Sequence, residues 1–134
     1  NVIDFINFST LGNAVDHGDL PETNSWGKAG ASSQTRGLFA GGAAARSTIS
    51  SITIHSAGDA IDFGDLSVGR RGVAGASSRT RGAFGGGDNP GDKNEIDFVT
   101  FTSAGTAADF GNLSVARGRL AANSNGHGGL ALTS

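Results

Sequence analysis

The sequence predicts an all-β protein built from one repeated unit, and three observations lead to this fold class. A segment that opens with Gly and closes with Leu occurs three times, and its first glycine stands at Gly12, Gly58 and Gly105. The unit therefore repeats every 46 to 47 residues, a period typical of repeat architectures. Short β-branched segments separated by Gly-rich turns fill each unit, and no sustained 3.6-residue apolar period accompanies them.

The middle unit shows the expected elements most clearly, in the order strand, turn, strand, turn. Positions rich in Gly and Asp supply the turns, because both residues tolerate positive φ. The four expected strands cover residues 49–56, 60–63, 73–78 and 83–87. Four short strands per unit are typical of a β-propeller blade. The chain is accordingly predicted to be one domain, 1–134, with repeats at approximately 1–46, 47–93 and 94–134.

The phase of the chain within this unit predicts how it is completed. The sequence opens on the third and fourth strands of a blade and closes on the first and second. Three blades are fewer than the four to eight of propellers, so we expect the chain to pair with itself or with further repeats of a longer chain. Two copies would give a six-bladed ring. The alternative is a threefold-symmetric fold, a β-prism or β-trefoil.

Composition narrows the possible partners and chemistry. The 134 residues carry a net charge of −2, which gives no reason to expect nucleic acid or an anionic membrane as partner. The chain has no cysteine, which excludes disulfides and thiolate metal sites. No apolar run approaches the ~18 residues of a membrane-spanning helix.

The repeated carboxylates and the scattered histidines predict structural roles. One carboxylate position recurs as Asp16, Asp62 and Asp109, and a second as Asp19 and Asp65, with Asn112 in the third copy. We expect these side chains to cap turns, because a turn tolerates Asp or Asn whereas an acid catalyst does not. The histidines are expected at the surface or in turns, since they occupy unlike repeat positions: His17, His55 and His127. No catalytic residue, metal ligand or cofactor is predicted, and the chain is not expected to be an enzyme.

Four residues are the candidates for ligand binding. Trp26 is the only tryptophan, and exposed tryptophan stacks on sugars, with Asn24 close enough in sequence to bind their hydroxyls. Arg79 and Arg81 belong to an arginine cluster that could contact acidic glycans. The alternative for these arginines is a set of ion pairs with the periodic aspartates, and the alternative for Trp26 is a place in the core or at a blade edge.

Several of these segments resemble kelch repeats: the diglycine Gly86-Gly87, the strand at 96–101, and the segment 110–113 followed by Arg117. Residues 77–87 and 96–117 are closer still to kelch-like arrays in virion proteins of tailed bacteriophages. The tryptophan usual in kelch repeats is replaced by Phe63 and Phe110.

The resemblance implies kelch-like propeller blades and a non-enzymatic structural or receptor-binding role in a phage particle, such as a tail fibre that attaches to the host. It implies a location on the virion, outside the cell, with a host surface glycan or other virion proteins as partners. The alternative function is that of a carbohydrate-binding propeller lectin.

Overall fold

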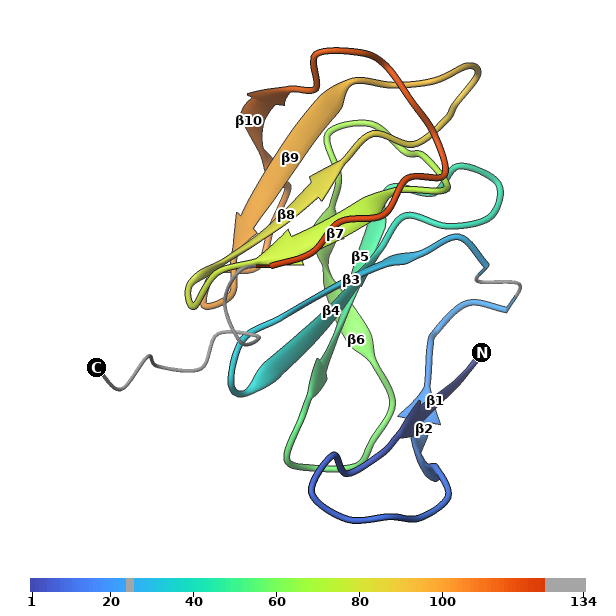
Figure 1. Cartoon of the computed structure of the whole chain (residues 1–134), viewed down its shortest axis with the longest axis vertical. Coiled ribbons are helices and arrows are strands. Elements are labelled where there is room, and N and C mark those ends of the chain that lie inside the picture. The colour runs from blue at the N-terminus through green and yellow to red at the C-terminus, as the bar shows by residue number, and fades with distance from the viewer. Residues whose placement is uncertain (24–25, 125–134) are drawn as a thin grey trace.

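The computed structural model describes residues 1–23 and 26–124, and this part of the chain contains ten strands and no helix. The strands form three antiparallel sheets, one of two strands and two of four strands (Figure 1). The predicted all-β class is confirmed. The described residues include no apolar helix of membrane-spanning length.

The strands follow one another in the sheets in the order of the chain. The two-stranded sheet pairs β1 (Val2–Phe5) with β2 (Val15–Asp19). The second sheet is the meander β3 (Ala29–Ser32), β4 (Arg36–Ala40), β5 (Thr48–Thr53) and β6 (Ile61–Asp65). The third is the meander β7 (Ala74–Ser77), β8 (Arg81–Gly85), β9 (Glu95–Thr100) and β10 (Ala108–Asn112). The two four-stranded sheets thus have the same order of strands.

The last strand of each sheet contains a β-bulge, which corrects one sequence prediction. The strand expected at 60–63 was predicted to stop at Gly64, but β6 continues to Asp65. Its register shifts so that Asp62 pairs with Ser50 and Gly64 with Ile49, and Phe63 is the extra residue. The same shift occurs between β1 and β2 and between β9 and β10. A glycine that punctuates the sequence therefore marks a bulge here, and not the end of a strand.

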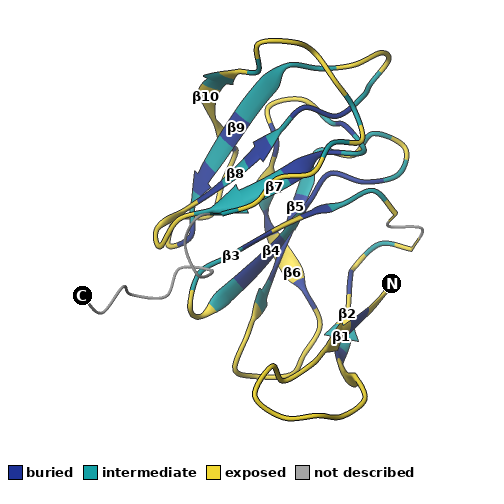
Figure 2. Ribbon diagram, in the orientation of Figure 1, coloured by how far each residue is buried: buried dark blue, intermediate teal, exposed yellow. Residues whose placement is uncertain are grey.

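The sheets pack face to face through two apolar clusters, and Figure 2 shows buried positions along the middle strands of both four-stranded sheets. The larger cluster joins the two four-stranded sheets and is made of Ala29, Ala31, Leu38, Ala40, Ile49, Phe63, Leu66, Val73, Phe84, Val99, Phe101 and Ala107. A smaller cluster of Ile3, Leu20 and Ala60 joins the two-stranded sheet to its neighbour. The three sheets form an open series in the described residues, and the predicted blade count and ring stay predictions.

The first strands of the two large sheets lie against each other. A Cβ atom on Gly75 of β7 would overlap the carbonyl oxygen of Gly30 in β3. Farther along, the Ser32 amide lies 3.4 Å from Ser77 Oγ, and the Ser77 amide donates to Ser124 Oγ at 2.7 Å. These serines are spaced by one repeat, so Ser124 stands to Ser77 as Ser77 stands to Ser32.

Candidate functional site

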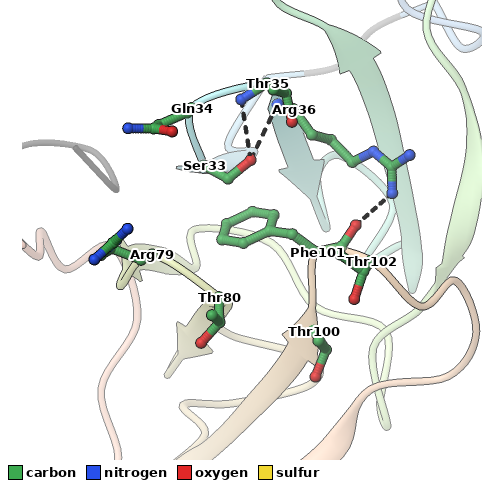
Figure 3. Close-up of a pocket in the computed structure, with 9 residues that line it drawn as sticks. All are labelled: Ser33, Gln34, Thr35, Arg36, Arg79, Thr80, Thr100, Phe101 and Thr102. Carbon is green, nitrogen blue, oxygen red and sulfur yellow. Dashed lines mark hydrogen bonds between the residues drawn. The ribbon is translucent and has the colours of Figure 1, made fainter. Parts of the chain in front are cut away.

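A hollow of about 630 Å³ lies where three loop regions meet at one end of the large sheets. It is bounded by the β3–β4 loop, the β7–β8 loop and the end of β9, and Figure 3 shows the lining residues together. The lining consists of Ser33, Gln34, Thr35, Arg36, Arg79, Thr80, Thr100, Phe101 and Thr102.

Two copies of the same serine turn hold the loops of the hollow in place. Ser33 Oγ accepts hydrogen bonds from the amides of Thr35 (3.3 Å) and Arg36 (3.1 Å). Ser78 Oγ does the same for Thr80 (3.3 Å) and Arg81 (3.1 Å). A serine hydroxyl that bonds to amides two and three residues later stabilises a tight turn. The repeated Ser-x-Thr-Arg-Gly motif is therefore the sequence of this hairpin loop.

The two arginines of the hollow have different surroundings. Arg36 Nη1 donates to the carbonyl oxygen of Phe101, and its guanidinium lies 5.3 Å from the ring centre of Phe63. Arg36 thus links the two large sheets. Arg79 is exposed, and its guanidinium forms no ion pair or hydrogen bond with the described residues. Of the two arginines that line the hollow, Arg79 is thus the one without a partner in the described part of the chain.

The remaining lining groups suit a hydroxylated, negatively charged ligand. The lining also includes the hydroxyl side chains Thr80, Thr100 and Thr102 and the amide side chain of Gln34, together with the ring of Phe101 (Figure 3). Hydroxyl and amide groups donate and accept hydrogen bonds, and a guanidinium binds carboxylate or sulfate in a forked geometry. The described residues contain no group of three side chains able to hold a metal ion.

Arg81 lies away from this hollow although it is close to Arg79 in sequence. Its Cζ lies 4.7 Å from the ring centre of Phe98, in the range of a cation–π contact. Of the two predicted ligand-binding arginines, the structure therefore places only Arg79 in the hollow.

Trp26 lies at the opposite end of β3 from the hollow, because it precedes this strand whereas Ser33 follows it. The ring is exposed, and the guanidinium of Arg71 lies 5.8 Å from its centre. Nearby, Lys28 forms an ion pair with Glu22 at 3.0 Å. Asn24 lies outside the described residues. The predicted ligand-binding residues thus belong to two separate places, one at Arg79 and one at Trp26.

The periodic aspartates are exposed and lie in the last strands of the sheets. Asp16 and Asp109 each accept a hydrogen bond, at 3.0 Å, from the amide of the bulge glycine two residues later. Asp65 Oδ1 accepts a hydrogen bond from Ser47 at 2.7 Å. Asp62 lies in β6 before the bulge, and the Asp19 amide donates to Asp59 Oδ1 at 3.0 Å.

Arginine pairing involves other aspartates than the periodic ones. Arg70 Nη2 lies 3.1 Å from Asp97 Oδ2, and both side chains are almost fully buried. Asp97 also accepts hydrogen bonds from the amide (3.0 Å) and the hydroxyl (2.7 Å) of Ser67. Arg71 Nε lies 2.7 Å from Asp88 Oδ1. The sequence reasoning missed Asp97, whose signal was an acidic residue in the middle of an apolar strand.

The prediction that every histidine lies at the surface or in a turn is wrong for His17. This residue is buried in β2, with its ring edge-on to Phe5 at 6.0 Å between centres. The alignment of His17 with Phe63 was the available signal, because Phe63 holds the same position in a buried cluster. His55 is exposed as expected, and His127 lies outside the described residues.

No family model matches this sequence, and no curated protein matches it.

Proposed function

We propose that this chain is a non-enzymatic, blade-built structural and receptor-binding component of a phage particle. It acts outside the cell, and its ligand is an acidic glycan of the host surface that binds in the hollow beside Arg79. The observation that carries the proposal is this hollow, at the loop end of two repeated sheets, where the guanidinium of Arg79 has no partner among the described residues and lies among hydroxyl groups.

The architecture supports the structural part of the proposal. Both four-stranded sheets are meanders with the same strand order, and each packs on the sheet before it. Blades of this kind form kelch-like propellers, and this arrangement favours a propeller over a β-prism or β-trefoil. The virion location rests on the resemblance of residues 77–87 and 96–117 to kelch-like arrays of phage proteins.

The chemistry of the hollow supports the receptor-binding part. Arg79 supplies the charge, and the threonine hydroxyls supply hydrogen bonds of the kind that sugar hydroxyls make. The loops are held by the serine turns, so little ordering would be needed on binding. Many copies on one particle would turn weak single contacts into avidity.

A lectin site at Trp26 is the second candidate. The exposed ring and Arg71 lie near a smaller hollow of about 420 Å³, which Arg71 and Arg119 line together with Asp88 and Asp92. A sugar stacked on Trp26 would use this end of the sheets and would leave Arg79 free.

A glycan array tests both candidates with four proteins: the wild type, Arg79→Gln, Trp26→Ala and the control Arg46→Gln. Arg46 is an exposed arginine outside both hollows, so its variant matches the charge change of Arg79→Gln. We expect the wild type, Arg46→Gln and Trp26→Ala to bind acidic glycans and Arg79→Gln to lose the signal. Loss with Trp26→Ala alone would assign binding to the second candidate. Absence of binding by the wild type to every glycan would contradict both.

A further inference from the structure

The last repeat exposes a surface that is buried in both earlier repeats. Phe110 of β10 is 60% exposed, whereas the equivalent residues Phe63 and His17 are only 4% and 6% exposed. A Cβ atom on Gly64 would overlap the carbonyl oxygen of Gly105 from the following repeat, whereas no atom of the described residues lies within 4 Å of such a Cβ on Gly111. We call the surface formed by residues 110–112, Ser114 and Arg117 the trailing face.

The same two backbone hydrogen bonds form at each of the two junctions within the chain. Each pair of bonds joins two carbonyl groups of a last strand to amides in the loop of the next repeat. They run from Gly58 to His17 (2.6 Å) and Ala60 to Asp19 (2.8 Å), and from Gly105 to Phe63 (2.8 Å) and Ala107 to Asp65 (2.7 Å). On the trailing face the equivalent carbonyls belong to Phe110 and Asn112. The equivalent amides at the start of the chain belong to Gly12 and Ala14, which are exposed.

A buried ion pair lies at the second junction, between the second and third sheets. Two residues at the equivalent positions, one in the last repeat and one in the first, carry the same two charges. Arg70 precedes the third sheet and reaches Asp97 in β9, which Ser67 also contacts. One repeat later, Arg117 and Ser114 hold the positions of Arg70 and Ser67.

The backbone of Arg117 is held in the same way as that of Arg70. The Arg70 amide donates to the Arg46 carbonyl (3.1 Å), and the Arg70 carbonyl accepts from the Gly42 amide (3.2 Å). In the same way, the Arg117 amide donates to the Lys93 carbonyl (3.0 Å), and the Arg117 carbonyl accepts from the Gly87 amide (3.0 Å). Arg117 is nevertheless exposed, and the residue that corresponds to Asp97 in the first sheet is the exposed Asp4. Asp4 pairs with Asp16 across its sheet as Asp97 pairs with Asp109.

At the first junction, between the first and second sheets, both members of this pair are replaced together. There the residue equivalent to Asp97 is Ser50, and the sequence position equivalent to Arg70 is Ser25, two residues before Gly27 as Arg70 is two before Gly72, so both are uncharged. A junction between Arg117 and Asp4 would have the charges of the second junction. The surface electrostatics at the two ends of the chain are thus complementary.

An aromatic residue at the start of the chain extends this complementarity. Phe8 is 96% exposed, whereas the equivalent Phe101 is 4% exposed and its carbonyl accepts a hydrogen bond from Arg36 of the preceding sheet. Arg81 of the last sheet is equivalent to Arg36 and is exposed. We call the surface formed by Asp4, Phe8, Gly12 and Ala14 the leading face.

We propose that the trailing face binds the leading face of a second copy of this chain, head to tail. Arg117 and Ser114 then hold Asp4 of the second copy, and the carbonyls of Phe110 and Asn112 accept hydrogen bonds from its Gly12 and Ala14 amides. Two such contacts close the pair, since each copy has one face of each kind. This inference rests on the proposed blade-built architecture and names its partner.

Cross-linking between two labelled chains tests the contact directly, because the natural sequence has no cysteine. Asn112→Cys protein is mixed with Ala14→Cys protein and treated with a short bismaleimide. The control partner is Ala57→Cys, at an exposed position of the middle repeat that lies on neither face. We expect several-fold more cross-linked pair with Ala14→Cys than with Ala57→Cys. Equal yields would overturn the proposal. The double variant Asp65→Cys/Ala107→Cys, whose positions are joined within one chain, shows that the reagent spans such a pair.

A charge exchange adds a second, independent measurement by sedimentation equilibrium. Arg117→Glu should weaken the association at least about thirtyfold, since it places two carboxylates together at a buried pair. Adding Asp4→Arg to the same chain should restore it, and Arg46→Glu should leave it unchanged. An Arg117→Glu chain that associates like Arg46→Glu, or a double variant that stays weak, would overturn the proposal. A chain that stays monomeric yet binds acidic glycans through Arg79 would overturn the docking alone, and a dimer that binds none would overturn the proposed function alone.

Discussion

At the scale of single residues, the bulge position of each last strand decides how closely the next repeat approaches. The bulge places His17, Phe63 or Phe110 out of register, and the glycine that follows has φ near +150° or +140°. Glycine is needed there for two reasons, the positive φ and, at Gly64, the neighbouring carbonyl.

Replacing His17 by Phe should stabilise the protein. The Nε2 atom of His17 is buried without a hydrogen-bond partner among the described residues, and an unsatisfied buried polar atom costs about 1–3 kcal/mol. Phenylalanine already fills the equivalent position at Phe63. We expect the free energy of unfolding in urea to rise by about 1 kcal/mol for His17→Phe and to change little for the control His55→Phe. A decrease for His17→Phe would show that the imidazole is needed.

The pair Gly64→Ala and Gly111→Ala separates the two roles of the bulge glycine. Both alanines would have an unfavourable φ, which costs on the order of 1–3 kcal/mol. Only the Cβ at position 64 would also overlap the carbonyl of Gly105, which adds roughly 1–3 kcal/mol. Unfolding is measured on dilute protein, so that Gly111 stays uncovered. Equal destabilisation of the two variants would contradict the close approach of the repeats.

At the scale of elements, the loop between β6 and β7 is tied to β9 by the buried pair of Arg70 and Asp97. Removing one partner of a buried ion pair leaves an uncompensated charge, whereas replacing both can be nearly neutral. The sequence of the chain also contains an uncharged version of this pair, with Ser25 and Ser50 at the equivalent positions.

Asp97→Ala should therefore lower the free energy of unfolding by about 3–5 kcal/mol. The double variant Arg70→Ser/Asp97→Ser has the residues found at the equivalent positions of the first junction, and it should recover a large part of this loss. Thermal and urea unfolding of the wild type and both variants provide the comparison. If the double variant were as unstable as Asp97→Ala, the charge of Arg70 would not be the cause.

The elements also show how far the sequence could predict the structure. The strands were predictable because β-branched residues alternate between Gly-rich turns, as in β5 and β9. The bulge in β6 could not be predicted, because a glycine such as Gly64 occurs both in turns and in bulged strands. Arg79 was predictable as a candidate from its arginine cluster. The hollow was not, since it needs three loops from different parts of the chain, and Phe101 gave no signal of its own.

At the scale of the whole molecule, the same contacts join the first sheet to the second and the second to the third. Each sheet covers the one before it with the same backbone bonds, so the last repeat exposes a face that is buried in the earlier repeats. Phe8 and Phe110 are exposed aromatic residues on the leading and trailing faces. A surface of this kind is typical of a protein–protein contact.

Native mass spectrometry of the wild-type chain across a range of concentrations tests this central claim most directly. Head-to-tail docking of two copies predicts a species of twice the chain mass of 13.3 kDa, which dissociates into folded monomers on dilution. A folded chain that remains at 13.3 kDa at every concentration would contradict the claim that the junction of the repeats continues between molecules.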